Sequence, residues 1–86
     1  MNTRRIRYTR HASEKFQLLK SYGFVVTEEY VEDIIENPDR VGQRDDLSLA
    51  IKSMDEKYGL RVVYRRTNYN IVVVTFCPVR RERFDV

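Results

Sequence analysis

Apolar residues are densest between Leu60 and Cys77, where two runs flank a short polar segment. Ile71–Phe76 consists of β-branched and aromatic residues, which predicts a central strand covered on both faces. Arg61–Arg66 mixes Val and Tyr with arginines, and Thr67–Asn70 supplies asparagines that tolerate turn geometry. We therefore predict a β-hairpin that places arginines beside a buried strand.

Helical spacing of apolar residues precedes the hairpin. One helix is predicted from about Arg10 to Tyr22 and a second between Thr27 and Asn37. Thr9 and Thr27 are expected to be the N-caps. The buried stripes of the two helices are expected to be Ala12, Phe16, Leu19, Val31, Ile34 and Ile35.

Alternating apolar and polar residues predict further strands. Arg5–Thr9 is a short first strand at or near a sheet edge, and Leu47–Lys52 is a half-buried strand. An extended piece around Val41 runs into a polar loop, and Pro78 is expected to end the last long strand. The order is β-α-α-β-β-β, an α+β fold of one strand, two helices and a three- to four-stranded antiparallel sheet. The helices cover one face, and the other face carries arginine or polar side chains.

Length and composition indicate a single domain spanning residues 1–86, with a basic C-terminal tail at 79–86. The longest apolar run is too short to span a bilayer, and no apolar stretch follows the charged N-terminus. The single cysteine cannot form an internal disulfide. We expect a cytoplasmic location and no association with a membrane.

Charge is unevenly distributed along the chain. The net charge of +3 divides into +5 for residues 1–20, −6 for residues 21–60 and +4 for residues 61–86. If the two basic ends meet in the fold, they form a basic face opposite an acidic helix, and such a face suits nucleic acid. The alternative is that these charges pair with one another across the surface.

Two segments resemble a known group of small domains. YTRHASEKF, from Tyr8, and GFVVTEEYVEDIIENPDRV, from Gly23, are similar to the BrnT-related domains, in which a His-Ala pair opens the first helix. YGLRVVYRR and IVVVTFCP fit the closing strands of that group. The element order resembles the wider RelE/ParE-type toxin superfamily. This resemblance implies a RelE-like fold, RNA cleavage that is often directed at mRNA on the ribosome, and a small antitoxin protein as partner.

His11 is the only histidine and stands in the first turn of the first predicted helix. Cleavage of RNA by its own 2′-hydroxyl needs proton transfer and cations for the phosphate charge. His11 suits the proton role, unless it merely caps or packs against the sheet. Arg61 and Arg65 share a strand face and suit a phosphate. No metal site and no cofactor are expected.

Other basic and aromatic residues complete the expected RNA-binding set. Lys15 follows His11 by one helical turn, although it could instead pair with Glu14 or Asp33. Tyr69, in the predicted turn, is the aromatic residue expected to be most exposed. The set is Lys15, Arg7, Tyr69, Arg80, Arg81 and Arg83.

Three functions remain open at this stage. The first is a toxin-like, metal-independent endoribonuclease or mRNA interferase that acts on RNA or the ribosome. The second is a non-catalytic RNA- or protein-binding module of the same fold, and the third is a ParE-like toxin directed at a topoisomerase. Whether the domain is an enzyme, and its oligomeric state, are left open by the sequence.

Overall fold

The strands and helices follow one another in the order expected of an α+β fold. The computed structural model describes residues 5–83. Its elements are β1 (Arg5–Tyr8), α1 (Arg10–Ser21), α2 (Glu28–Glu36), β2 (Arg40–Arg44), β3 (Leu47–Ser53), β4 (Tyr58–Arg66), β5 (Asn70–Arg80) and a short 3-10 helix (Arg81–Arg83). The α+β class, the N-terminal strand and the two helices are therefore confirmed.

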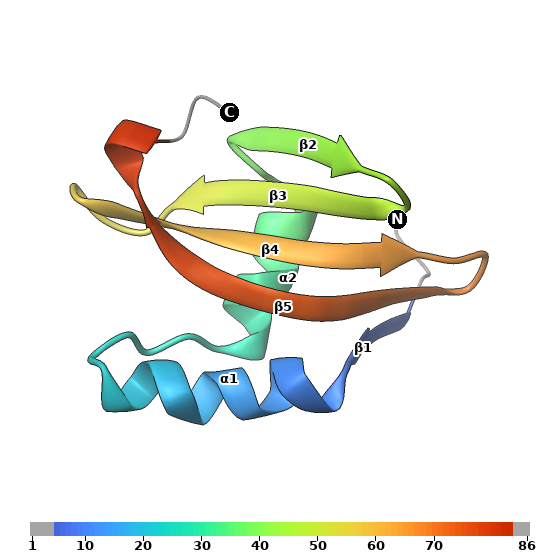
Figure 1. The fold of residues 1–86 in the computed structure, drawn as a ribbon, viewed down its shortest axis with the longest axis horizontal. Helices are drawn as coiled ribbons and strands as arrows, with labels where there is room; N and C mark the ends of the chain where they lie inside the picture. Colours follow the sequence, from blue (N-terminus) through green and yellow to red (C-terminus); the bar gives the residue numbers. More distant parts are fainter. Residues whose placement is uncertain (1–4, 84–86) are drawn as a thin grey trace.

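The sheet is larger than predicted. It has five strands in the order β1-β5-β4-β3-β2, with β1 parallel to β5 and every other pair antiparallel (Figure 1). The additional strand is β2, which we expected to be an extended piece followed by a loop. All five of its residues are exposed, so burial imposes no alternating pattern on its sequence. The first strand lies at the sheet edge, as expected.

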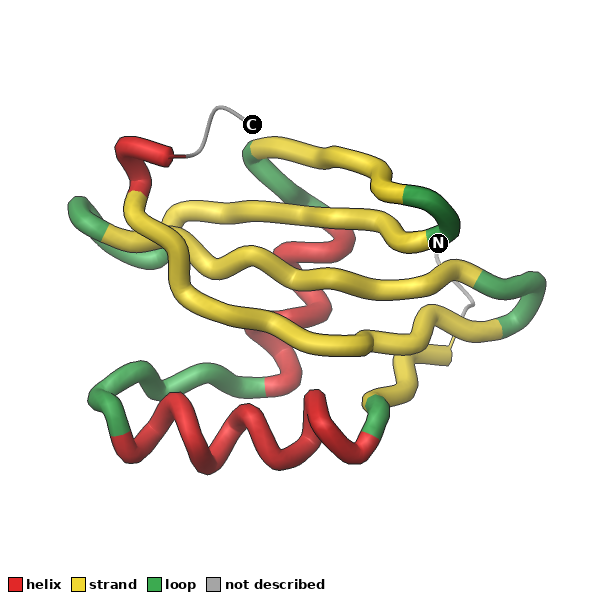
Figure 2. The backbone as a smooth tube through the Cα atoms, in the orientation of Figure 1, coloured by secondary structure: helices red, strands yellow, loops and turns green. Residues whose placement is uncertain are grey.

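In Figure 2, α2 lies behind the strands and α1 lies along the β5 edge, and both helices contribute buried side chains to one core. α1 runs along β5 and β1, and α2 crosses β3 and β4. The largest fully buried side chains come from β4, β5 and α2, and they are Phe76, Ile34, Leu60, Ile71, Val31, Val62 and Val73. Five of the six residues expected to form the helical stripes are buried, and the sixth, Phe16, packs against the ring of Phe76. The core therefore fills the space between the helices and one face of the sheet.

The helix ends follow the predicted capping. The Thr9 hydroxyl accepts a hydrogen bond from the Ala12 backbone N–H, and the Thr27 hydroxyl accepts one from the Tyr30 N–H. Gly23, just after α1, has a φ of 92°, the left-handed conformation that glycine tolerates best. Within residues 5–83, no helix is long and apolar enough to cross a membrane.

β5 continues beyond the point where we expected it to stop. Pro78 lies opposite Leu60 inside the strand, which runs on to Arg80, so the prediction that Pro78 ends it is wrong. β1 pairs only with the segment from Asn70 to Val73, and no other strand of residues 5–83 lies beside the rest of that side of β5. Proline is tolerated at such an edge because no ladder hydrogen bond requires its missing N–H.

The expected basic tail begins as regular structure. Val79 and Arg80 are strand residues, and Arg81–Arg83 form the short 3-10 helix. The Arg81 backbone N–H donates to the Lys57 carbonyl over 2.9 Å, which holds this segment against the β3–β4 turn. Residues 84–86 of the expected tail lie outside the described residues.

Candidate functional site

The two faces of the sheet carry different side chains. Leu60, Val62 and Tyr64 of β4 point toward the helices and are buried. The residues opposite one another on the other face form two rows: Arg40, Ile51, Arg61 and Cys77, then Gly42, Leu49, Val63 and Thr75. We call this surface the helix-free face. It combines aliphatic side chains with arginines rather than carrying polar residues alone.

The apolar stripe of β3 belongs to the helix-free face. Ala50 is fully buried and lies opposite Val62, so it is the β3 residue that faces the helical core. The larger residues Leu47, Leu49 and Ile51 therefore point away from the helices, and Ile51 is nevertheless only 5% exposed. The alternation predicted the strand correctly, but it carried no information on which face the helices would cover.

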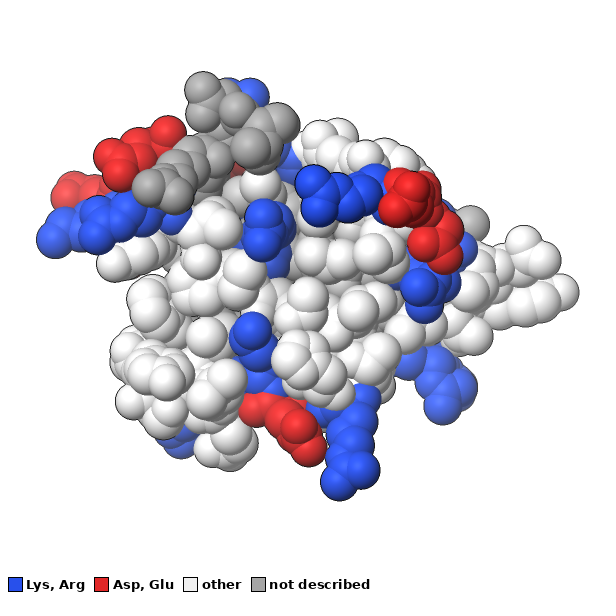
Figure 3. Space-filling view, in the orientation of Figure 1, with Lys and Arg blue, Asp and Glu red and all other residues white. Residues whose placement is uncertain are grey.

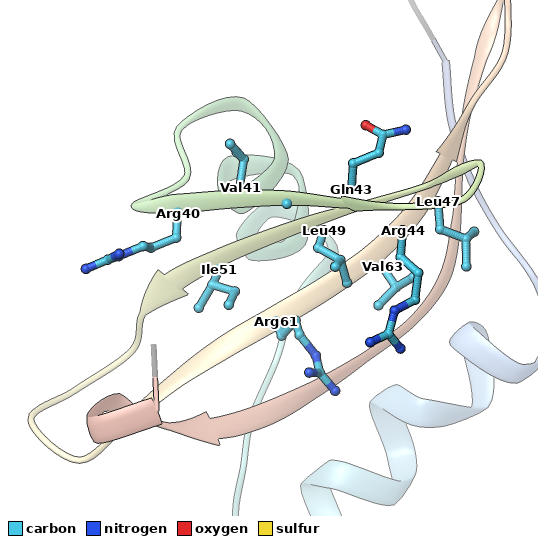
Figure 4. A pocket seen from close by; sticks show the side chains of 10 residues that line it. Arg40, Val41, Gln43, Arg44, Leu47, Leu49, Ile51, Arg61 and Val63 are labelled. Atoms are coloured by element: carbon cyan, nitrogen blue, oxygen red, sulfur yellow. The ribbon is translucent and has the colours of Figure 1, made fainter. Parts of the chain in front are cut away.

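These side chains line a hollow of about 440 Å³. Its floor is aliphatic, and Arg40, Arg44 and Arg61 lie around it. Figure 4 shows the three arginines on the same side of the sheet as the floor residues Leu47, Leu49, Ile51 and Val63, whereas Val41 and Gln43 point to the other side of β2. We call this feature the arginine hollow.

Most of the helix-free face is uncharged, and its charged side chains are mainly basic (Figure 3). Figure 3 looks onto it and shows lysine and arginine spread over the surface, with acidic side chains at the margins. The ion pairs of the described residues are Arg10–Glu14, Lys52–Asp33 and Arg65–Asp46. Within residues 5–83, no acidic side chain therefore forms an ion pair with any arginine of the hollow.

Arg61 is the half-buried arginine of this group. Its Nη2 donates to the Cys77 Sγ over 3.6 Å, a weak acceptor. Its Nε is buried and has no hydrogen-bond partner among the described residues. Buried donors are nearly always paired in native proteins, so this guanidinium lacks the strong acceptor that an anion would supply.

A β-bulge brings Thr75 onto the same face. Val63 lies opposite Thr75 and Tyr64 lies opposite Val73, so Val74 is left without a partner. The extra residue allows Val73 and Phe76 both to remain fully buried, and it turns Thr75 toward the helix-free face. Bulges commonly redirect a side chain in this way near functional sites.

His11 reaches Thr75 from the start of α1. The Thr9 backbone N–H donates to the Val73 carbonyl and the Thr9 hydroxyl donates to the Val74 carbonyl, both over 3.0 Å. These two bonds hold the start of α1 against the bulge. The exposed His11 ring then lies with its Nε2 3.2 Å from the Thr75 Oγ1.

His11, Thr75, Cys77 and Arg61 form what we call the His11 corner. Thr75 and Cys77 are two residues apart on β5, which is about 7 Å along a strand. His11 contacts the first and Arg61 contacts the second. Two of the three residues predicted to be catalytic, His11 and Arg61, therefore contact alternate residues of the same strand.

Arg65, the third of these, lies away from the corner. It is opposite Val72, and its Nε donates to the Asp46 Oδ2 over 3.0 Å. Arg7 of β1 is also opposite Val72, so both arginines are on the helix-free face at the β1 end of the sheet. Neither arginine contacts a residue of the His11 corner in the hydrogen bonds and ion pairs of residues 5–83.

Lys15 is half-buried and follows His11 by one turn of α1. The two acids considered as its partners pair elsewhere, Glu14 with Arg10 over 3.4 Å and Asp33 with Lys52 over 2.6 Å. Lys15 is therefore a cation on the His11 side of the helix, without an ion pair to either of those acids.

The remaining predicted contacts lie at the two ends of the sheet. Tyr69 in the β4–β5 turn is 81% exposed, as expected. Arg80 ends β5, with its guanidinium carbon 5.7 Å from the centre of the Tyr58 ring. Arg81 and Arg83 follow in the 3-10 helix. Tyr69 and Arg80 are separated by nearly the whole length of β5, over 30 Å, so the structure does not bring this group together.

Sequence reasoning missed Arg40 and Arg44. They belong to the strand that was not predicted, and their i, i+4 spacing placed them on one face only once that strand was known. The floor of the hollow was visible as the alternation of β3, but it was assigned no function. Only the bulge, which sequence periodicity does not show, relates Thr75 to His11.

The shifted pKa values belong to structural groups. Burial raises the pKa of Tyr8, whose hydroxyl is buried and has no hydrogen-bond partner among the described residues. Hydrogen bonds from Lys52 and Asn37 lower the pKa of Asp33. Backbone N–H groups lower the pKa of Asp39, through Ser53, and of Asp55, through Tyr58 and Lys57.

Comparisons of this chain with protein-family models, with curated proteins and with solved structures find no match. The resemblance to RelE/ParE-type toxins and BrnT-related domains therefore stays a prediction. The candidate site depends on its geometry alone.

Proposed function

We propose that this protein is a toxin-like, metal-independent endoribonuclease that binds RNA across its helix-free face and cleaves it at the His11 corner. One observation carries the proposal. The Nε2 of the single histidine lies 3.2 Å from the Thr75 Oγ1, on the same sheet face as Arg61, whose half-buried side chain has an Nε with no hydrogen-bond partner in residues 5–83.

Each residue of the corner has a chemical role in this proposal. His11 takes the proton from the 2′-hydroxyl as that oxygen attacks the adjacent phosphorus, or returns a proton to the departing 5′-oxygen. Thr75 orients the imidazole through its hydroxyl. Arg61 donates to the phosphate oxygens as their charge increases, an interaction that is strong where water is partly excluded.

Further cations bind the phosphates on either side. Lys15 lies one turn from His11 and adds positive charge beside the leaving group. In this proposal, Arg7 and Arg65 bind phosphates of the RNA strand where the helix-free face reaches β1. Such contacts are electrostatic and independent of base sequence, so they provide affinity rather than specificity.

A non-catalytic RNA-binding module is the second candidate. The observation that favours it is that the chain has one histidine, so a second proton-transfer group must be a lysine or another residue with a less suitable ordinary pKa. This candidate uses the same arginines but predicts binding without scission.

The test is scission of single-stranded RNA in the presence of EDTA by the wild type, His11→Ala and Lys20→Ala. Lys20 is exposed in the last turn of α1 and serves as the matched surface control. Loss of general acid–base catalysis typically costs 10²- to 10⁴-fold. We expect a loss in this range for His11→Ala only, with unchanged circular dichroism, and products ending in a 2′,3′-cyclic phosphate.

Equal scission by the wild type and His11→Ala would remove His11 from the mechanism. RNA binding without scission by the wild type would favour the binding module. The toxin role is tested separately, by expressing the protein in growing bacterial cells. We expect growth arrest that needs His11. Arrest that survives His11→Ala and is accompanied by gyrase inhibition would instead indicate the topoisomerase-directed alternative.

A further inference from the structure

The arginine hollow is a second feature of the helix-free face, distinct from the His11 corner. It lies over β2, β3 and β4, whereas the corner lies over β5 and the start of α1. Arg61 belongs to both, because its side chain lines the hollow and donates to Cys77. A ligand that fills the hollow is therefore held directly beside the corner.

Two properties of the hollow define its ligand. Its volume of about 440 Å³ is within the range typical of small-molecule sites, roughly 300–1,000 Å³. Three guanidinium groups lie around it, and none is in an ion pair with an acid of residues 5–83. The hollow therefore suits a small ligand that has a negatively charged group.

The aliphatic floor of the hollow indicates that the ligand also has an apolar part. The half-buried side chains of Leu47, Leu49 and Val63 provide an aliphatic surface that a hydrated inorganic anion would not cover. A flat ring can lie on such a surface and stack against a guanidinium plane. A nucleotide combines the ring with the phosphate, and it is the building block of the proposed substrate.

We propose that the arginine hollow is a subsite for one nucleotide of single-stranded RNA, next to the scissile phosphate. The base lies on the aliphatic floor, and its phosphate is bound by Arg44 and Arg61. Arg40 adds positive charge at the other end of β2. This inference rests on the proposed function, since it specifies where the substrate adjacent to the cleaved bond is held.

The experiment separates binding in the hollow from cleavage. It uses the full chain carrying His11→Ala, which keeps the hollow intact, and follows methyl and arginine side-chain NMR signals during titration. The probes are a nucleoside 5′-monophosphate, the uncharged nucleoside and inorganic phosphate. We expect the nucleotide to bind at least about tenfold more tightly than either fragment, and to shift the methyl signals of Leu49, Ile51 and Val63.

Arg44→Ala tests the phosphate contact. Arg44 is exposed on an edge strand, so the substitution leaves the fold intact. We expect at least a tenfold loss of nucleotide affinity, which corresponds to about 1.4 kcal/mol. Lys20→Ala removes the same charge from the far end of α1 and should leave the affinity unchanged.

Three results would overturn the subsite. One is inorganic phosphate binding as tightly as the nucleotide without methyl shifts, which would indicate an anion site only. Another is an equal affinity of Arg44→Ala and Lys20→Ala. The third is binding of the uncharged nucleoside as tightly as the nucleotide, which would show that the arginines bind no phosphate. If the nucleotide binds in the hollow but the wild type does not cleave RNA, the proposed nuclease is refuted and the nucleotide-binding site remains. If the wild type cleaves RNA but no nucleotide binds in the hollow, the subsite is refuted and the nuclease remains.

Discussion

The two faces of the β4–β5 hairpin differ in how deeply their side chains are buried and in whether their polar groups are hydrogen-bonded. On the helix-covered face, Phe76, Val62 and Val73 are fully buried and apolar. On the helix-free face, Arg61 is half-buried with an unpartnered Nε, and an aliphatic floor lies open beside it. The first face of the hairpin is filled by apolar side chains packed against the helices. The second leaves apolar surface and positive charge available to a ligand.

The bulge at Val74 shows how one strand serves both faces. Phe76 and Thr75 are neighbours in the chain, but the first fills the core and the second contacts His11. Without the extra residue, strict alternation would place Phe76 and Val73 on opposite faces. The irregularity therefore lets the hairpin keep its core while presenting a polar group at the candidate site.

Substitutions of these neighbours should have the most unequal effects on stability. Phe76→Ala removes a fully buried aromatic ring and should lower the free energy of unfolding by about 3–5 kcal/mol. Thr75→Val keeps the shape and should change it by less than about 1 kcal/mol, but should reduce RNA scission by disconnecting His11. Urea denaturation and a scission assay on both variants check this contrast, which a large loss of stability in Thr75→Val would contradict.

Replacing Arg61 should affect function and stability in opposite directions. Arg61→Met removes a buried donor without a partner and keeps the aliphatic stem, so stability should stay equal or rise by about 1 kcal/mol. Scission should fall by roughly 10²-fold because a phosphate donor is lost. Thermal unfolding and single-turnover kinetics measure the two effects, and Lys20→Met is the matched control. A parallel loss of stability and activity would show that Arg61 is structural.

The two N-cap threonines offer a smaller but paired comparison. Thr27 caps α2 only, whereas Thr9 caps α1 and also donates to the Val74 carbonyl. Thr27→Ala should cost about 1 kcal/mol and Thr9→Ala about 2 kcal/mol. Only Thr9→Ala should also reduce scission, because it loosens His11, and Thr9→Ser should restore it. If Thr9→Ala and Thr27→Ala changed scission equally, the hydrogen bonds that hold the start of α1 would not be needed for activity.

The loss of stability at low pH should come from carboxylates in turns rather than from residues of the candidate site. Backbone N–H groups of Tyr58 and Lys57 lower the pKa of Asp55 in the folded state. Its stabilising effect is therefore present above the ordinary aspartate pKa of about 4 and is lost as pH falls through the lower, folded value. Asp55→Asn should unfold at slightly lower urea concentration than the wild type at pH 7. The two midpoints should converge as the pH falls below the lowered pKa of Asp55 in the folded state. A constant difference across pH would contradict this assignment.

Local signals predicted much of this fold. Thr9 and Thr27 mark the helix starts correctly because N-capping depends on neighbouring residues only. Features that depend on how distant segments pair were harder to predict from the sequence. β2 is fully exposed and carries no hydrophobic period, and Pro78 is accommodated only because β1 is too short to reach it.

The candidate site was predictable in its chemistry but not in its extent. His11 and Arg61 were predicted as site residues from residue type, position and, for His11, the family resemblance; they contact Thr75 and Cys77 of β5, and their catalytic role stays a prediction. Which side of β3 the helices would cover depended on Ala50 leaving room for α2, a packing choice that alternation does not encode. The arginine hollow was therefore hidden until the strands were paired.

The most direct test of the central claim is RNA scission by the purified wild type and His11→Ala, with free RNA and translating ribosomes side by side. We predict scission by the wild type in at least one format, loss of 10²-fold or more in the variant, and identical circular dichroism. Absence of scission by the wild type in both formats would contradict the account, and the helix-free face would then be a binding surface without catalysis.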